Sequence, residues 1–335
     1  MEYRQLGKSD VRVSVVTFGA WAIGGAMWGG ADENDAIAAI QASIEAGVTS
    51  IDTAPVYGFG KSEELVAKAV AGKRDKVQLL TKFGLRWDEI AEGEPFFDLR
   101  EKGKTYKIYR NSRKHKIIQE CEDSLRRLNT DRIDLYQCHW RDHTTAIEET
   151  AEALAQLIKE GKIRAAGVSN FTPEEIAEAE KIVPIASNQP PYSMLQRDIE
   201  KKMVPFCIEN KVGLIVYSPM ERGLLTGKFS PDHRFAADDH RAQYPMFFPE
   251  NIKLVNEFLG RLRPIAEKHK ATIGQLVINW TLRQQGITAA LVGARNSEQA
   301  LENAHAVSFH LSDDELASIN RELQQLKLVE PLKAK

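Results

Sequence analysis

The segment Val48-Thr49-Ser50-Ile51-Asp52-Thr53-Ala54-Pro55-Val56-Tyr57-Gly58 joins a short apolar run to a carboxylate and, five residues after it, a phenol. The apolar run at 48–51 is typical of a buried parallel strand. In a barrel of alternating strands and helices the strand ends hold the catalytic side chains, so this acid and this tyrosine are well placed for proton transfer. Asp-Thr before Pro is also a common turn or helix-cap sequence. Taken alone, the segment leaves a catalytic and a structural interpretation open.

The alternation of apolar runs and helical patterns extends from this segment in both directions. Eight strand candidates lie at 15–18, 48–51, 77–80, 133–136, 163–168, 185–186, 214–216 and 288–292. Apolar residues with helical spacing occur at 32–46, 62–71, 113–128, 146–160, 173–181, 275–283 and 297–304. This order predicts an α/β fold, a (β/α)8 TIM barrel.

A doubly wound open sheet is the alternative on strand counting alone. It would need a glycine-rich fingerprint after its first strand. The segment Gly19-Ala20-Trp21-Ala22-Ile23-Gly24-Gly25 lacks the strict spacing and the helix that should follow at once. The barrel is therefore the better prediction. No linker-like composition divides the chain, so we expect a single domain over 1–335.

Four segments extend the plain repeat. The runs 3–6 and 11–13 flank Gly7-Lys8-Ser9-Asp10 and predict an N-terminal hairpin. Long loops are expected after strand 3, at 84–112, and after strand 7, at 219–251, where insertions usually shape the pocket. Leu311-Ser312-Asp313-Asp314-Glu315 has the capped, acidic start of a C-terminal tail helix.

The composition points to a small-molecule partner. The net charge of −2 argues against nucleic acid and membrane surfaces, which are usually met by an excess of Lys and Arg. Cys121, Cys138 and Cys207 are too few and too scattered for a disulfide framework or a metal site. No apolar signal core or membrane-length run is present, so we expect a cytoplasmic protein with no particular oligomeric state indicated.

Two more polar side chains lie at predicted strand ends. Lys82 follows the third run, and His139 ends the fourth. Each has a structural explanation, since a lysine can extend to solvent and a histidine there is often a satisfied structural residue. In a barrel, however, both would meet Asp52 and Tyr57 on one rim.

These four side chains would form a proton-transfer group. A free phenol has a pKa of about 10, and a nearby ammonium favours the phenolate, so Lys82 is expected to ease proton release from Tyr57. Asp52 would hold the lysine in place. His139 would orient a carbonyl oxygen, which Tyr57 would protonate. This chemistry needs neither a metal nor a serine or cysteine nucleophile.

The motifs resemble the aldo-keto reductase superfamily over nearly the whole chain, in particular bacterial NADPH-dependent members related to the potassium-channel beta-subunit branch. The similarity rests on Asp52-Thr53-Ala54 with Tyr57-Gly58, on Lys82, and on 133–136 followed by His139-Trp140. It continues through 161–164, 167–171, Gln189, 217–219 and 223–228. The resemblance implies a barrel that binds a nicotinamide dinucleotide without a Rossmann fold and reduces an aldehyde or ketone, with Tyr57 as the general acid.

The resemblance also implies cofactor-binding positions. Those expected at the nicotinamide end are Gly19, Ala20, Trp21, Ser169, Asn170, Gln189 and Tyr217, the last stacking on the ring. Those in the loop expected to close over the pyrophosphate are Ser218, Pro219, Met220, Gly223, Leu225 and Lys228. Those at the adenosine end are Gly293, Arg295, Gln299, Glu302 and Asn303. Ordinary turn chemistry is the alternative explanation for the glycines.

One departure from the family pattern bears on the cofactor. Better-known members have Lys-Ser where this chain has Gly293-Ala294, so that lysine is missing. Arg295 is expected to replace it as the partner of a 2′-phosphate, because a guanidinium binds phosphate in bidentate fashion. We therefore predict NADPH or NADP+ in preference to NADH.

Two functions fit these features. The first is NADPH-dependent reduction of a small carbonyl compound, and the second is a cofactor-binding interaction module with little turnover, resembling potassium-channel beta subunits. The complete catalytic group favours the enzyme. For the substrate, Trp28, Trp87, Trp140 and Phe59 would form an apolar wall, whereas Arg86, Arg141 and Arg222 would attract a hydroxylated or anionic compound. The polar insertion 84–112 favours a sugar-like or hydroxy-carbonyl substrate.

Overall fold

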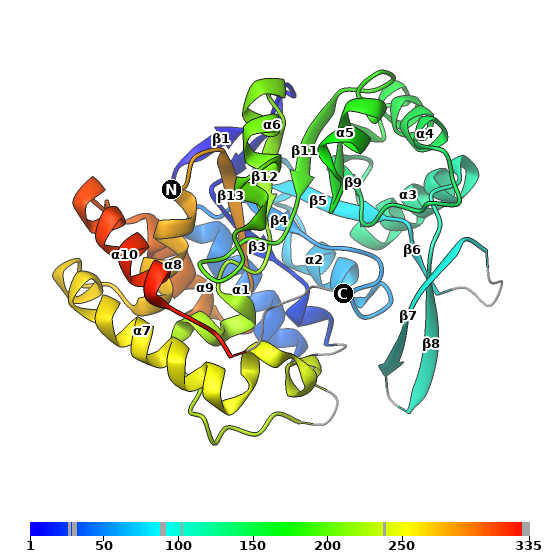
Figure 1. Ribbon diagram of the computed structural model, residues 1–335. Coiled ribbons are helices and arrows are strands. Elements are labelled where there is room, and N and C mark those ends of the chain that lie inside the picture. Colours follow the sequence, from blue (N-terminus) through cyan, green and yellow to red (C-terminus); the bar gives the residue numbers. More distant parts are fainter. Residues whose placement is uncertain (26–27, 29–31, 88–91, 102, 237–238, 330–335) are drawn as a thin grey trace.

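Figure 1 shows a computed structural model of the chain, which describes residues 1–25, 28, 32–87, 92–101, 103–236 and 239–329. A closed barrel of eight parallel strands lies at its centre, and its last strand pairs with its first. In order around the barrel the strands are β3 (Val16–Gly19), β4 (Ser50–Asp52), β5 (Gln78–Phe83), β9 (Ile133–Cys138), β10 (Ile163–Ser169), β11 (Ile185–Gln189), β12 (Gly213–Val216) and β13 (Ile287–Val292). The predicted (β/α)8 barrel is confirmed.

Several strands extend beyond the apolar runs that predicted them. β5 includes Lys82, and β9 and β11 include Gln137 and Gln189. Backbone pairing continues the ladder there whatever the side chain is, to both neighbours at Gln137 and to one neighbour at Lys82 and Gln189. The register places Lys82 opposite Gln137, and Gln137 opposite Gly167. Polar side chains from adjacent strands are thus brought together at one end of the barrel.

Helices surround the barrel (Figure 1). Their bounds are α1 (Glu33–Glu45), α2 (Lys61–Ala69), α3 (Lys114–Leu128), α4 (Ile147–Lys159), α5 (Pro173–Ala179), α6 (Met203–Asn210), α7 (Pro249–Lys268), α8 (Ile273–Leu282), α9 (Ser297–Ala304) and α10 (Asp313–Gln325). The expected tail helix is α10, where Ser312 and Glu315 form a capping box that satisfies the first backbone N–H groups.

The helical pattern missed α6 and α7. Both contain a proline, Pro205 in the first turn of α6 and Pro264 inside α7, and proline usually marks the end of a helix. A first-turn proline is tolerated because its missing N–H would have had no partner within the helix. In α7, Ile252, Val255 and Phe258 are buried where the helix packs beside α8 and α10, which outweighs the local interruption.

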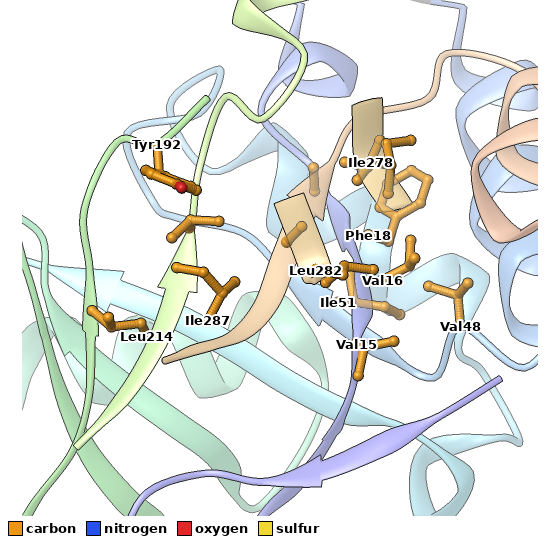
Figure 2. Packing of buried hydrophobic residues seen from close by; sticks show 14 of the residues in the cluster. Val15, Val16, Phe18, Val48, Ile51, Tyr192, Leu214, Ile278, Leu282 and Ile287 are labelled. Atoms are coloured by element: carbon orange, nitrogen blue, oxygen red, sulfur yellow. The ribbon is translucent and has the colours of Figure 1, made fainter. Parts of the chain in front are cut away.

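Two apolar cores flank the strands. The outer one lies between strands and helices, and Figure 2 shows part of it, with Val16 and Phe18 from β3 and Ile278 from α8 in one cluster. The inner one fills the barrel. There the hairpin of β1 (Tyr3–Gln5) and β2 (Arg12–Ser14) contributes Leu6 and Val11 to a cluster with side chains of the strands. The predicted N-terminal hairpin is present, and it closes the end of the barrel opposite the polar residues.

The insertion at 84–112 is not a plain loop, and that expectation is wrong. Its described part forms a three-stranded antiparallel sheet of β6 (Leu85–Arg86), β8 (Lys104–Arg110) and β7 (Glu94–Glu101), which projects from the barrel (Figure 1). The sheet forms because alternate residues, including Leu99 and Ile108, are apolar and pack in a buried cluster, although the overall composition is polar. Residues 88–91 and 102 lie outside the described part.

In the segment after β12 the described residues form the short 3-10 helices η4 (Glu221–Thr226), η5 (His240–Gln243) and η6 (Pro245–Phe247). Among the described residues, no helix combines the length and apolar character needed to cross a membrane. The same part of the chain holds no cluster of three or more His, Cys, Asp or Glu side chains suited to a metal ion. All three cysteines are free thiols and buried.

Candidate active site

Lys82 is the centre of the predicted catalytic group. Its ammonium donates to Asp52 Oδ1 at 2.5 Å, to the Thr53 carbonyl oxygen at 3.0 Å and to Tyr57 Oη at 3.2 Å. The lysine is fully buried. Burial opposes its charge, but Asp52 and Tyr57 outweigh that effect, and the pKa of Lys82 lies above its ordinary value. The three protons of a charged Lys82 therefore all have acceptors, and one of these acceptors is the phenol.

Two glutamines, one of them not predicted, hold the other oxygen of Asp52. Gln137 Nε2 donates to Asp52 Oδ2 at 3.1 Å, and Gln189 Nε2 donates to the same oxygen at 2.9 Å and to Gln137 Oε1 at 3.0 Å. Gly167 makes room for this arrangement, since a Cβ there would lie 2.9 Å from Gln137 Cγ. The amide nitrogen of Gln189 is thus engaged inside the barrel, and the group it offers to a ligand is its carbonyl oxygen.

His139 lies beside Tyr57, with the two ring centroids 5.7 Å apart and the rings nearly perpendicular. Burial and the charge of Lys82 lower the pKa of His139 well below its ordinary value. The imidazole is therefore neutral at physiological pH. A neutral imidazole still has one N–H to donate, which is the role expected of it toward a carbonyl oxygen.

Lys82 lowers the pKa of Tyr57 as expected, but it does not decide the net shift. Burial raises the pKa of Tyr57, and the nearby ammonium offsets this only in part, so the net shift is upward. The sequence-based expectation neglected desolvation, which disfavours the phenolate. At neutral pH Tyr57 is a protonated phenol, and a general acid must start in that form.

Two glycines fix the loop that presents Tyr57. A Cβ at Gly58 would overlap the carbonyl oxygen of Gly24, and a Cβ at Gly24 would lie 2.8 Å from the Tyr57 carbonyl carbon. Gly58 also has φ +65°, which favours glycine. The loop after β3 and the loop after β4 thus pack backbone against backbone, and this contact sets the position of the phenol.

A cavity of about 730 Å³ opens in front of this group. Asp52, Tyr57 and His139 line it, and Lys82 lies behind them, fully buried. The cavity is also lined by every expected cofactor position except Leu225: Gly19, Ala20, Trp21, Ser169, Asn170, Gln189, Tyr217, Ser218, Pro219, Met220, Gly223, Lys228, Gly293, Arg295, Gln299, Glu302 and Asn303. Leu225 instead packs its side chain in the outer core.

The sequence matches the aldo/keto reductase family model over residues 15–323. It is 38% identical over 327 residues to the aldo-keto reductase YhdN of Bacillus subtilis, covering 97% of this chain and 94% of that protein. The chain belongs to the aldo/keto reductase family. It is also 35% identical over 326 residues to the NADH-specific methylglyoxal reductase of Escherichia coli, covering 96% of this chain and 97% of that one. The solved structure of the glycerol dehydrogenase AKR11B4 from Gluconobacter oxydans superposes with a TM-score of 0.87 at 37% identity, covering 99% and 98% of the two chains.

Aldo/keto reductases use nicotinamide cofactors, and the cavity of this chain fits a dinucleotide. Arg295 and Lys228 line the end near α9, where the helix N-terminus favours phosphate groups. Arg222 also lines the cavity, and its buried Nε has no hydrogen-bond partner in the described part of the chain. An unpaired buried donor is costly, so an anionic ligand would satisfy it.

The expected nicotinamide end of this reductase is held by one hydrogen-bonded group. Asn170, with an uncommon φ of +62°, donates to the His139 carbonyl oxygen at 3.2 Å and to Ser169 Oγ at 3.0 Å. Tyr217 Oη donates to Asn170 Oδ1 at 3.0 Å. Strained backbone of this kind persists where the surrounding structure requires it, often at ligand sites. The contacts fix the ring of Tyr217 at the cavity wall.

The loop after β12 is fastened by a buried carboxylate that sequence reasoning missed. Glu221 accepts from Ser193 Oγ at 2.7 Å and from Tyr244 Oη at 3.3 Å. At the far end of the loop, Lys228 Nζ lies 3.7 Å from Glu302 Oε2, so an ion pair joins the two sides of the cavity. In the sequence, Glu221 is an acidic residue within a glycine-rich loop. Composition alone does not show whether such a residue is buried or exposed at the surface.

The expected substrate residues divide into two groups. Trp28, Trp140 and Arg222 line the cavity. The other aromatic residues, Phe59 and Trp87, pack on each other with ring centroids 5.3 Å apart and do not line it. Arg86 and Arg141 also lie outside the lining, near the carboxylates of Glu120 and Glu175 respectively.

Proposed function

We propose that this protein reduces an aldehyde or ketone to the alcohol, with NADPH as hydride donor and Tyr57 as the general acid. The observation that supports this most strongly is the 3.2 Å contact between Tyr57 Oη and a fully buried Lys82. Lys82 is itself held by Asp52 Oδ1, while the glutamines donate to the other carboxylate oxygen, Oδ2. The relatives named as methylglyoxal reductase and glycerol dehydrogenase support the carbonyl chemistry of this proposal, whereas the first of them is named as NADH-specific and so does not support the choice of NADPH.

The side chains have separate roles in the proposed reaction. A bound reduced nicotinamide supplies a hydride to the carbonyl carbon. Tyr57 gives its proton to the carbonyl oxygen as negative charge develops there, and Lys82 stabilises the resulting phenolate. His139, neutral because of burial, donates a hydrogen bond that orients the same oxygen. Asp52 keeps Lys82 charged and in place.

The choice of NADPH over NADH rests on Arg295. Arg295 lines the end of the cavity near α9, where the adenosine is expected, and its backbone N–H donates to Gln299 Oε1 at 3.0 Å. A guanidinium there binds a 2′-phosphate, which NADH lacks. Arg295→Ala is expected to lower the preference for NADPH at least tenfold, measured as the ratio of kcat/KM for the two cofactors. An unchanged ratio would refute the assignment.

The test of the whole proposal is turnover. Purified protein with NADPH and a panel of aldehydes should oxidise the cofactor, followed by the loss of its absorbance, with one alcohol formed per cofactor. Tight binding of cofactor with no turnover on any aldehyde would favour the interaction module instead.

A further inference from the structure

The inserted sheet gives the cavity an apolar wall at its substrate end. Leu85 from β6 and Phe96, Phe97 and Leu99 from β7 all line the cavity. Leu99 and Leu85 belong to a buried cluster that also contains Ile108 of β8. The wall is therefore backed by packed side chains.

A β-bulge places two consecutive phenylalanines on this wall. Neighbouring residues of a regular strand point to opposite faces, so Phe96 and Phe97 would not both line one cavity. Pro95 pairs with Tyr109 and Phe97 with Ile108, which leaves Phe96 as an extra residue at a register shift. A bulge of this kind bends the strand and redirects a side chain. The two rings lie 5.0 Å apart and nearly perpendicular.

The wall is fixed to the loop that follows β9, next to the catalytic group. The ring centroids of Phe96 and Trp140 lie 5.2 Å apart. The Arg110 guanidinium also contacts the Phe96 ring, 4.6 Å from its centroid. Glu94 accepts from Arg110 Nη2 at 2.7 Å and from the backbone N–H of His143 at 3.0 Å. These contacts hold the base of β7 against the rim of the barrel.

Among the described side chains of the insertion, the polar ones lie away from the cavity. Asp98, Lys104, Thr105 and Lys107 are exposed, and none of them lines the cavity. The polar composition of the insertion was one reason to expect a sugar-like or hydroxy-carbonyl substrate, and the described polar side chains of the insertion do not face the cavity; of the arginines that were the other reason, Arg222 does line it. The cavity is further lined by Trp21 and Trp28, whose rings meet edge to face at 5.1 Å.

We propose that this wall makes the enzyme select carbonyl compounds with a flat apolar substituent, such as a phenyl ring, over small hydroxylated aldehydes. The proposal rests on the proposed carbonyl-reductase function, because it names the substrate class of the same site. A phenyl group against the wall loses apolar surface to water and gains edge-to-face ring contacts. A hydroxyl group in the same place loses its water without a hydrogen bond in return.

The experiment compares two aliphatic aldehydes, hydrocinnamaldehyde and glyceraldehyde, by the ratio of their kcat/KM values. Phe97 is the test position because it lines the cavity yet is 36% exposed, so its truncation leaves the sheet folded. The wild-type ratio is expected to exceed ten, and Phe97→Ala to lower it about fivefold or more. Phe97→Leu retains apolar surface and should change it less than about twofold. Lys107→Ala, on the outer side of the same sheet, is the matched control and should leave it unchanged.

Two results would overturn the proposal: a wild-type preference for glyceraldehyde, or an unchanged ratio in Phe97→Ala. If neither aldehyde is reduced, the proposed carbonyl-reductase function is wrong for these substrates. The role of the apolar wall is then tested separately, by measuring ligand binding. Hydrocinnamyl alcohol should change the tryptophan fluorescence of the wild type, with a dissociation constant several-fold higher in Phe97→Ala. Equal dissociation constants in the two proteins would also refute the proposal that the wall binds the phenyl group.

Discussion

Gln137 Nε2 donates to Asp52 Oδ2 at 3.1 Å, so a neutral amide from β9 supports the carboxylate that holds Lys82. Gln137 also accepts from Gln189, which lines the cavity. One fully buried side chain therefore fixes both the proton-transfer group and the residue expected at the nicotinamide carboxamide.

Replacing this amide should affect chemistry and cofactor binding together. Gln137→Leu removes a hydrogen bond to a charged group, an interaction worth about 1.5–3 kcal/mol, and leaves Gln189 Nε2 with Asp52 Oδ2 as its remaining acceptor. We expect kcat to fall roughly tenfold or more and the cofactor dissociation constant to rise. The measurements are steady-state kinetics and cofactor titration. Leu135→Met, a volume-conserving change two residues earlier in β9, is the control. If Gln137→Leu has normal kcat and normal cofactor affinity, Gln137 positions neither the proton-transfer group nor the cofactor site.

The packing of Gly58 on Gly24 predicts that a single methyl group displaces the phenol. In Gly58→Ala the added carbon overlaps the Gly24 carbonyl oxygen at a left-handed backbone position, so the loop must shift. A shift of about 1 Å can cost roughly a hundredfold in rate, so kcat should fall between tenfold and a hundredfold.

Gly260→Ala is the matched control for this change. Nothing lies within 4 Å of its added carbon, and Gly260 is inside α7. It should raise the free energy of unfolding by about 1 kcal/mol and leave kcat alone. Equal kinetics for the two alanine variants would show that the glycine contact does not position Tyr57.

The buried, neutral His139 predicts a pH dependence of stability. Its pKa in the folded protein is lowered from the ordinary value of 6.5, so below that pH the unfolded chain takes up a proton that the folded chain does not. The free energy of unfolding should then fall as pH drops below about 6.5, by up to about 1.4 kcal/mol per pH unit from this one group. Above that pH the contribution is constant.

The measurement is urea unfolding of the wild type and His139→Asn at several pH values. The difference in unfolding free energy between the two proteins should be constant above about pH 7. At acid pH the wild type should lose more unfolding free energy than the variant, which lacks the histidine. A difference that does not vary with pH would mean that His139 titrates normally in the folded state.

The repeated pattern was sufficient for the barrel and for the residues at its rim, whereas most of the cavity lining was expected from the family resemblance. Polar residues that end apolar runs, such as Lys82 and His139, had to meet at one rim once eight strands closed into a barrel. Gln137 escaped notice because it lies inside a strand, where one polar residue looks like an interruption. Its alternation with Leu135 was the available signal, since both side chains then face the barrel interior.

Other features depend on contacts that no local pattern contains. The direction of the Tyr57 pKa is set by burial, which becomes known only when the loops around it are placed. The insertion forms a sheet because Leu99 and Ile108 find partners on the barrel rim, and its bulge decides that Phe96 and Phe97 share a face. The roles assigned to the lining residues stay predictions until variants are measured.

The central claim is that the Tyr57 phenol, held by Lys82, is the proton donor for carbonyl reduction. Tyr57→Phe removes the proton and keeps the ring, so the most direct measurement is the single-turnover rate of aldehyde reduction by this variant with NADPH bound. We predict a loss of about a hundredfold to ten-thousandfold, with cofactor affinity within about threefold of the wild type. A single-turnover rate equal to that of the wild type would contradict the account.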